Sequence, residues 1–242
     1  MYTYFWIQIT NIWANAMKFD KFNISEEIKD NLYNMGFDRT TDIQYKTIPA
    51  ILKGEDVLAI AQTGTGKTAA FAIPVIHNIQ QAKLNQHVQG ISCLVMAPTH
   101  ELAKQISEVF VSISKNTGVK TTVIIGGVDQ DPQIDRLKSG TDVLVATPGR
   151  LLELVDSNAV HLTEIEALVL DEADKMLNLG FKDEMNRIFA LLPKKRQNLL
   201  FSATLSDDVN NVNQVLLNEP VIIKIEAEEN TLDLIDQIAY SV

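Results

Sequence analysis

The stretch AQTGTGKT at residues 61–68 decides the fold of this chain, because it joins a short apolar run to a helical stretch. Residues 57–61 have the composition of a buried strand, and Gly64 and Gly66 let the backbone turn after it so that successive N–H groups converge. The helix that follows adds the positive end of its dipole at the same point. The stretch therefore predicts a phosphate-binding loop; a plain glycine-rich turn between a strand and a helix is the alternative.

The end of this loop carries two residues with direct chemical roles. We expect Lys67 to contact the β- and γ-phosphates of a nucleotide and Thr68 to place its hydroxyl on Mg²⁺. The residues expected to bind the nucleotide around its phosphates are Gln62, Thr63, Gly64, Thr65, Gly66, Lys67, Thr68 and Ala69.

The rest of the chain alternates short apolar runs with amphipathic stretches. The further apolar runs are 93–97, 122–125, 143–146, 167–170, 199–202 and 221–225, and helical candidates are 101–114, 151–155, 183–192 and 207–216. Apolar runs without polar alternation are typical of strands covered on both faces. The pattern predicts an α/β fold, a mostly parallel sheet of about seven strands with helices on both faces and ligands at the carboxyl ends of the strands.

Acidic residues follow one of these predicted strands, in the stretch VLDEAD at residues 169–174. An aspartate at the end of a buried strand, here Asp171, is the usual second anchor for Mg²⁺. Glu172 is placed to orient or deprotonate a water for attack on a γ-phosphate. The expected catalytic residues are therefore Lys67, Asp171 and Glu172; a solvated helix N-terminus with acids in its first turn is the alternative.

Composition limits the classes of protein to which the chain belongs. Its 242 residues, 46% of them hydrophobic, suffice for one large domain. The net charge of −10 lacks the basic character of a sequence-independent nucleic-acid binder, so any such site must be local. The single cysteine, Cys93, lies in an apolar run and excludes a disulfide framework, which favours a buried side chain in a reducing compartment.

The two ends differ from the predicted domain, which we place at residues 17–225. Residues 1–16 carry no charge, contain polar interruptions and precede a second methionine, so they are neither a typical signal peptide nor long enough to span a bilayer. We interpret them as an upstream extension or a cloning artefact. Residues 226–242 contain five acidic residues and no lysine or arginine, and we interpret them as a linker toward an absent second domain.

In combination, AQTGTGKT and DEAD resemble the DEAD-box family of ATP-dependent RNA helicases. Further segments match that family in its order, from about residue 19 onward: GF at 36–37, Thr41 with IQ at 43–44, PTHELA at 98–103, GG at 126–127, TPGR at 147–150 and SAT at 202–204. The resemblance implies that the chain is the N-terminal one of two RecA-like domains. Such a domain binds ATP and Mg²⁺ and contacts mainly the sugar–phosphate backbone of RNA.

The resemblance also implies roles for particular residues. Gln44 would select adenine, because an amide donates and accepts in parallel. Phe37 would pack near the base, with an ordinary core position as its alternative. Phe22 is either a second aromatic at the base or an ordinary core residue. The expected RNA-binding residues are Pro98, Thr99, Gly127, Thr147 and Arg150, and the residues expected to couple ATP to RNA are Asp174, Ser202 and Thr204.

Ordinary structural roles are the alternatives for several of these residues. A plain turn at 126–127, a surface or helix-capping role for Arg150 and a local backbone role for Ser202 and Thr204 all stay open. His100 and Thr40 stand where the family has arginine and proline, and histidine lacks the charge and fork geometry of a guanidinium. His77, His87 and His161 show no metal-ligand spacing and are interpreted as structural or exposed.

The resemblance leads to expectations for the whole molecule. In the family a second domain supplies arginines to the γ-phosphate, and here the last arginine is Arg196. Because an arginine finger contributes about 10³–10⁵ in rate, we expect this chain to bind nucleotide but hydrolyse it very slowly. We expect a cytoplasmic monomer without membrane attachment. A DNA-directed translocase and a clamp that uses ATP only to hold RNA or a protein are the rival interpretations.

Overall fold

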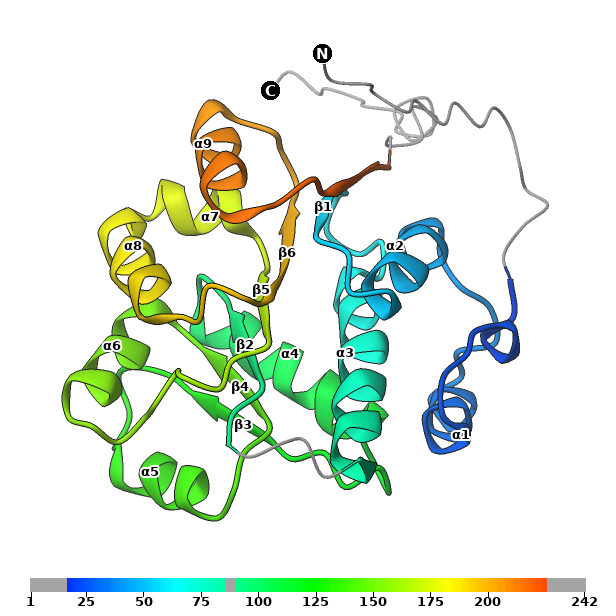
Figure 1. The fold of residues 1–242 in the computed structure, drawn as a ribbon, viewed down its shortest axis with the longest axis horizontal. Helices are drawn as coiled ribbons and strands as arrows, with labels where there is room; N and C mark the ends of the chain where they lie inside the picture. The colour runs from blue at the N-terminus through cyan, green and yellow to red at the C-terminus, as the bar shows by residue number, and fades with distance from the viewer. Residues whose placement is uncertain (1–16, 86–89, 226–242) are drawn as a thin grey trace, which may run out of the picture.

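The strands form a single parallel sheet in the computed structural model, which describes residues 17–85 and 90–225 (Figure 1). The strands are β1 Val57–Ile60, β2 Cys93–Met96, β3 Thr121–Ile124, β4 Val143–Ala146, β5 Ala167–Leu170, β6 Gln197–Ser202 and β7 Val221–Lys224. Their order in the sheet is β3-β4-β2-β5-β6-β1-β7, and every pair is parallel. The predicted α/β fold with a parallel sheet of about seven strands is confirmed.

Helices cover both faces of this sheet. They are α1 Glu26–Asn34, α2 Asp42–Leu52, α3 Lys67–Leu84, α4 His100–Ile113, α5 Asp131–Lys138, α6 Pro148–Asp156, α7 Ala173–Asn178, α8 Lys182–Leu191 and α9 Asp207–Leu216, with a short 3-10 helix η1 at Phe19–Lys21. Side chains of α1 to α4 form one core with Val57 and Ala59 of β1, whereas side chains of α6 to α9 form another with Leu58. Successive residues of β1 thus point to opposite faces, and both faces are buried.

Most element bounds lie within one or two residues of those predicted. Strands β1 and β2 end one residue earlier than expected, although the next N–H of each still bonds to a neighbouring strand, at Ala61 to the Ser202 carbonyl and at Ala97 to the Ala146 carbonyl. Helix α6 begins three residues earlier than expected, at Pro148, because proline is well suited to the first helical position. Helices α1, α2, α5 and α7 were not among the predicted helices.

Some predictions concern residues that the structure does not describe. The interpretations of residues 1–16 and 226–242, and that of His87, lie outside the described residues. Within the described part of the chain, none of the helices has the length and apolar character needed to cross a membrane. Cys93 is fully buried in β2, as expected from its apolar neighbours.

Candidate functional site

All predicted site segments other than the one around Phe37 and Gln44 directly follow strands. Because the sheet is parallel, these segments lie along one edge of it, the carboxyl edge. The ends of β1, β5 and β6 carry the phosphate loop, the acidic stretch and SAT; we call this the nucleotide half of the edge. The ends of β2, β3 and β4 carry PTHELA, the glycine pair 126–127 and TPGR; we call this the backbone half.

The phosphate loop is a tight turn into α3. Gly64 and Gly66 have φ of 86° and 91°, a region that suits glycine, and Gly66 is the N-cap of α3. The ammonium of Lys67 is buried and donates to the carbonyl of Ala61 at 3.0 Å. The Thr65 hydroxyl donates to the Gln62 carbonyl at 2.8 Å. A loop closed by its own side chains at a helix N-terminus leaves backbone N–H groups for an anion.

Gln44 connects the start of α2 to this loop. Its Oε1 accepts from the Thr41 backbone N–H at 2.9 Å, and its Nε2 donates to the Gly66 carbonyl at 3.2 Å. The first contact belongs to a capping box, whose S/T-x-x-E/Q pattern is visible in the sequence and could have located α2. The second has no sequence signal. A Cβ on Gly66 would lie 2.6 Å from Gln44 Nε2, so a side chain here would displace the Gln44 amide, and the φ of 91° itself favours glycine.

Asp171 is the buried carboxylate of the nucleotide half. It is 2% exposed at the end of β5, and burial raises its pKa to about 6. The positive charge of Lys67 opposes that rise in pKa, and Glu172 adds to it. Glu172 has a left-handed φ of 52°, and its N–H donates to Asp171 Oδ1 at 3.0 Å. The Glu172 carboxylate contacts Lys175 Nζ at 3.1 Å, a pair that sequence reasoning missed.

The oxygen donors here suit Mg²⁺. Thr68 and Asp171 supply a hydroxyl and a carboxylate, and Mg²⁺ is bound in proteins by one or two carboxylates together with substrate phosphates and waters. Among residues 17–85 and 90–225 no group of three or more His, Cys, Asp or Glu side chains could hold a metal by itself. A hydroxyl and a carboxylate are donors of the kind that bind Mg²⁺ together with phosphates and waters.

A short hydrogen-bond chain joins the ends of β5 and β6. The Thr204 hydroxyl and backbone N–H donate to Asp174 Oδ2 at 2.9 and 3.2 Å. The Ser202 hydroxyl donates to the Thr204 carbonyl at 2.8 Å. Burial raises the pKa of Asp174, but hydrogen bonds from Thr204, Ser202 and nearby backbone N–H groups outweigh it and lower the pKa.

The backbone half is built from the N-termini of α4 and α6 and the loop after β3. Pro98 is buried, Thr147 is the N-cap of α6, and the Thr99 hydroxyl caps α4 by accepting from a backbone N–H at 3.2 Å. Gly127 is exposed with φ of 69°. These residues offer α4 and α6 N-termini and a glycine backbone at one edge.

Arg150 is the buried cation of the backbone half. It is only 9% exposed; its Nε contacts Glu153 at 2.7 Å, and its Nη2 donates to the Val128 carbonyl at 3.0 Å. Its Nη1 is buried without a hydrogen-bond partner among the described residues. Leaving a charged donor unpaired is costly, so this nitrogen would gain from an anionic ligand.

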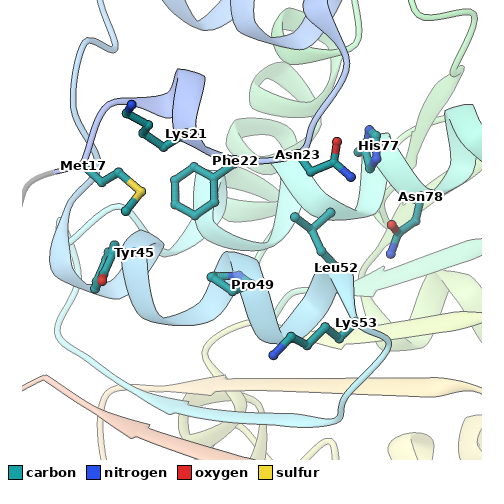
Figure 2. Close-up of a pocket in the computed structure, with 10 residues that line it drawn as sticks. All are labelled: Met17, Lys21, Phe22, Asn23, Tyr45, Pro49, Leu52, Lys53, His77 and Asn78. Carbon is teal, nitrogen blue, oxygen red and sulfur yellow. The ribbon is translucent and has the colours of Figure 1, made fainter.

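The predicted aromatic residues lie in different environments. Phe37 is 37% exposed in the turn after α1, where its N–H donates to the Leu32 carbonyl. Phe22 is 7% exposed within the core, 6.3 Å from the ring of Phe19. Phe22 also borders a hollow of about 640 Å³ between the first described segment, α2 and α3 (Figure 2). The hollow is lined by Met17, Lys21, Phe22, Asn23, Tyr45, Pro49, Leu52, Lys53, His77 and Asn78.

Thr40 and His77 have structural contacts. The N–H and hydroxyl of Thr40 donate to the Met17 carbonyl at 3.0 and 3.2 Å, and a proline at this position would have neither donor. His77 Nδ1 accepts from the Ser25 N–H at 3.2 Å, and burial lowers the pKa of this imidazole. The Thr40 departure thus ties the loop before α2 to the start of the described chain.

Known sequences resemble the chain over most of its length. The family model for DEAD/DEAH box helicase matches residues 41–212. The ATP-dependent RNA helicase CshA of Listeria monocytogenes is 43% identical over 220 residues, which are 91% of this chain and 41% of that protein. The DEAD-box ATP-dependent RNA helicase CshA of Geobacillus kaustophilus is 42% identical over 90% of this chain and 46% of its own length. The chain therefore spans less than half of these two curated relatives.

Solved structures resemble the chain as well. A DEAD box protein from the hyperthermophile Methanococcus jannaschii superposes with a TM-score of 0.81 at 36% identity, covering 87% of this chain and 56% of that one. A hypothetical ATP-dependent RNA helicase from Sulfolobus tokodaii superposes with a TM-score of 0.76 at 34% identity, covering 84% and 57%.

Proposed function

The chain belongs to the DEAD/DEAH box helicase family, and from this premise we propose that it is the ATP-binding domain of an ATP-dependent RNA helicase. The observation that carries the proposal is the convergence of three separate segments on one point. Gln44 contacts Gly66, Lys67 closes the loop onto Ala61, and the charge of Lys67 acts on buried Asp171. A triphosphate with a divalent cation suits that combination of cation, backbone N–H groups and carboxylate.

The residues divide the proposed chemistry among them. Lys67 and the loop N–H groups bind and orient the phosphates, while Thr68 and Asp171 would hold Mg²⁺, which would supply positive charge at the phosphates. Glu172 positions or deprotonates the attacking water, and its contact with Lys175 holds its carboxylate in place. Gln44 and Phe37 bind the base. Asp174, Ser202 and Thr204 transmit the state of the nucleotide half toward the rest of the molecule.

RNA is the proposed second ligand, bound along the backbone half. Pro98, Thr99, Gly127, Thr147 and Arg150 would contact phosphates and 2′-hydroxyls rather than base edges. The unpartnered Nη1 of Arg150 supports this assignment, since phosphate oxygen supplies the missing acceptor.

The activity of the whole protein is part of the same proposal. The curated relatives are more than twice as long as their matched part, and we propose that a second RecA-like domain following this one completes the site. The protein would then use ATP to separate short RNA duplexes, whereas this chain alone binds nucleotide and hydrolyses it very slowly. We propose a cytoplasmic monomer, in keeping with its acidic net charge of −10 and its buried cysteine.

Competition between nucleotides tests the adenine assignment. The chain is titrated with fluorescent ADP in the presence of Mg²⁺, and unlabelled adenine and guanine nucleotides then compete. Adenine nucleotides are expected to displace fluorescent ADP at lower concentrations than guanine nucleotides. Gln44→Ala should reduce this preference by about tenfold or more, because a bidentate amide contact is worth about 1–3 kcal/mol.

A second variant separates base recognition from capping. Gln44→Glu keeps an oxygen that accepts from the Thr41 N–H but loses the amide donors. If Gln44→Glu retains the full preference for adenine, the base-reading role is wrong. If the unsubstituted chain binds no nucleotide, the proposed function itself fails.

A further inference from the structure

Strand β3 forms one end of the sheet, and its outer side has no neighbouring strand among the described residues (Figure 1). On its inner side, the carbonyls of Lys120 and Ile124 accept from N–H groups of β4 and of the residue that follows β4. Alternate residues of a strand direct their backbone groups to opposite sides. The N–H and C=O groups of Thr121 and Val123 therefore point outward, away from β4.

Gln133 of α5 shows what kind of partner this edge accepts. Ile125, just beyond the end of β3, is the next residue after Val123 whose backbone groups point outward. Gln133 Oε1 accepts from the Ile125 N–H at 2.9 Å, and Gln133 Nε2 donates to the Ile125 carbonyl at 3.3 Å. A neighbouring strand would supply the same pair of bonds. An added strand would extend this pattern to Thr121 and Val123.

A hollow of about 350 Å³ lies beside the first residues of β3, between the last turns of α4 and α5. It is at the amino end of the strand, away from the carboxyl edge that carries the proposed nucleotide and RNA sites. Thr121 lines the hollow, and its hydroxyl oxygen is buried without a hydrogen-bond partner in the described part of the chain. Because buried polar atoms are nearly always paired, this oxygen points to a ligand here.

Two cations and no carboxylate line this hollow within the described ranges. They are Lys120 and Arg136, and neither forms an ion pair with a described residue. The surrounding segments, residues 107–122 and 131–142, carry four carboxylates and four cations. One of these carboxylates, Asp142, is paired with a fifth cation, a lysine of α3, which leaves an excess of one positive charge. In a chain of net charge −10, this local excess favours an acidic partner.

The two sides of the hollow differ in chemistry. On the α4 side, Val111 is 49% exposed and Val119 is buried in the core that α4 shares. On the α5 side, Lys120 Nζ donates to the Ser139 carbonyl at 3.0 Å, and Arg136 is exposed. An added strand directs alternate side chains to opposite faces of the sheet. Its side chains would therefore meet an apolar surface and a cationic surface in turn.

We propose that the outer edge of β3 binds an extended peptide of a partner protein, in which apolar and acidic residues alternate, as an added strand of the sheet. The backbone of the peptide bonds to Thr121 and Val123, its apolar side chains contact Val111, and its carboxylates contact Lys120 and Arg136. A nucleic-acid backbone fits less well, because phosphate oxygens accept hydrogen bonds but give none to the outward carbonyls. The inference goes beyond the proposed function and requires neither nucleotide nor RNA.

The test begins with two labelled peptides and the nucleotide-free chain. In one peptide the core alternates valine and aspartate, and in the other lysine replaces each aspartate. Fluorescence anisotropy in low salt measures the affinity of each. We expect the aspartate peptide to bind about tenfold more tightly, the scale of two exposed ion pairs. Equal affinities for the two peptides would overturn the inference.

A reversal of charge tests the contact with Arg136. Arg136→Glu should weaken binding of the aspartate peptide by about five- to tenfold and strengthen binding of the lysine peptide by a similar factor. Lys182→Glu makes the same change of charge at an exposed position of α8 and should alter neither affinity. An Arg136→Glu chain that keeps the original preference for the aspartate peptide contradicts the assignment.

A proline tests the backbone contact. Thr121→Pro removes an outward N–H but no hydrogen bond to β4, and edge strands tolerate proline in this orientation. It should weaken binding of the aspartate peptide by about tenfold, the scale of one lost backbone hydrogen bond. Unchanged affinity would mean that the peptide does not pair with β3.

Hydrogen exchange of the unsubstituted chain provides a test that needs no substitution. The amides of Thr121 and Val123 should exchange rapidly in the free chain and about tenfold more slowly with the aspartate peptide bound. Unchanged exchange at both amides in the complex would place the peptide elsewhere and overturn the inference. Slow exchange already in the free chain would mean that another part of the chain or a second copy covers the edge. Displacement of the peptide by a short uridine-rich RNA would likewise overturn the peptide assignment.

Discussion

The two halves of the carboxyl edge differ in how their polar groups are satisfied. In the nucleotide half the polar side chains contact one another or the backbone: Lys67 contacts Ala61, Gln44 contacts Gly66, and Thr204 contacts Asp174. In the backbone half Arg150 keeps one buried nitrogen without a partner, and His100 and Gly127 are exposed. Among the described residues, the buried side-chain nitrogen left unpaired at the carboxyl edge thus lies in the backbone half.

This difference matches the two ligands that we propose for the two halves. A small charged ligand that must be told from close relatives is best bound by buried groups held in fixed positions, because electrostatic contacts are strong where water is excluded. A long backbone read without regard to sequence needs repeated contacts at an exposed surface. If the two halves bind different ligands, substitutions in one half will weaken the binding of one ligand and leave the binding of the other unchanged.

The largest effect is expected from Lys67→Ala. Loss of a buried cation that contacts phosphate should weaken ADP–Mg²⁺ binding by about 100-fold, the scale of a hydrogen bond to a charged group. Isothermal titration calorimetry measures it, with exposed Lys53→Ala as the matched control. RNA affinity without nucleotide should not change, and a parallel loss of RNA binding would contradict the division into two halves.

A smaller effect, on stability, is expected from Asp171→Asn. Because burial raises the pKa of Asp171 to about 6, the folded chain holds a proton between about pH 4 and 6 that the unfolded chain has released. This group therefore favours folding at acid pH, and that contribution is lost as the pH rises through about 6. Above that pH the buried charge costs stability, which asparagine avoids.

The measurement is urea unfolding of nucleotide-free chain and variant at two pH values. Asp171→Asn should be about 1–2 kcal/mol more stable than the unsubstituted chain at pH 7.5, and the gain should shrink at pH 5.0. The gain is limited because Lys67 loses an opposing charge. A variant that is less stable at pH 7.5 would show that the carboxylate stabilises the empty site, and nucleotide binding with Mg²⁺ should be lost in either case.

The smallest effect is expected from Arg150→Gln. Loss of one phosphate contact should weaken RNA binding by about tenfold and reduce the slope of log affinity against log salt by about 1. Arg150→Lys should restore the charge but only part of the affinity, because lysine lacks the planar fork. Glu153→Gln, which removes only the ion pair, is the control. ADP affinity should stay constant throughout; an unchanged salt slope would argue against the phosphate contact.

The sequence allowed the prediction of most of the sheet because each strand is a short apolar run between amphipathic stretches. Strands β4 and β5 begin and end where the composition changes. Helices α1 and α5 were missed because their apolar faces are narrow. In α5, for example, the buried side chain is that of Gln133, which is polar. Helix α2 was missed although Thr41 and Gln44 form a capping-box pattern, which is a detectable signal.

The site was less predictable than the fold, because contacts between distant segments leave no local pattern. The motif order predicted a nucleotide-binding role for Gln44, but its contact with the Gly66 carbonyl depends on how α2 packs against α3. The position of His100 over the loop after β3 depends on the strand order β3-β4-β2, which local periodicity does not encode.

By itself, the sequence determined the parallel α/β architecture, the phosphate loop and the acidic strand end, because backbone conformation and strand burial follow from nearby residues. The tertiary structure alone decided which groups are buried together. It raised the pKa of Asp171 by removing water, brought the Gln44 amide against Gly66, and left Arg150 Nη1 without a partner among the described residues. These are consequences of solvent exclusion and close approach, which arise only when segments far apart in the chain meet.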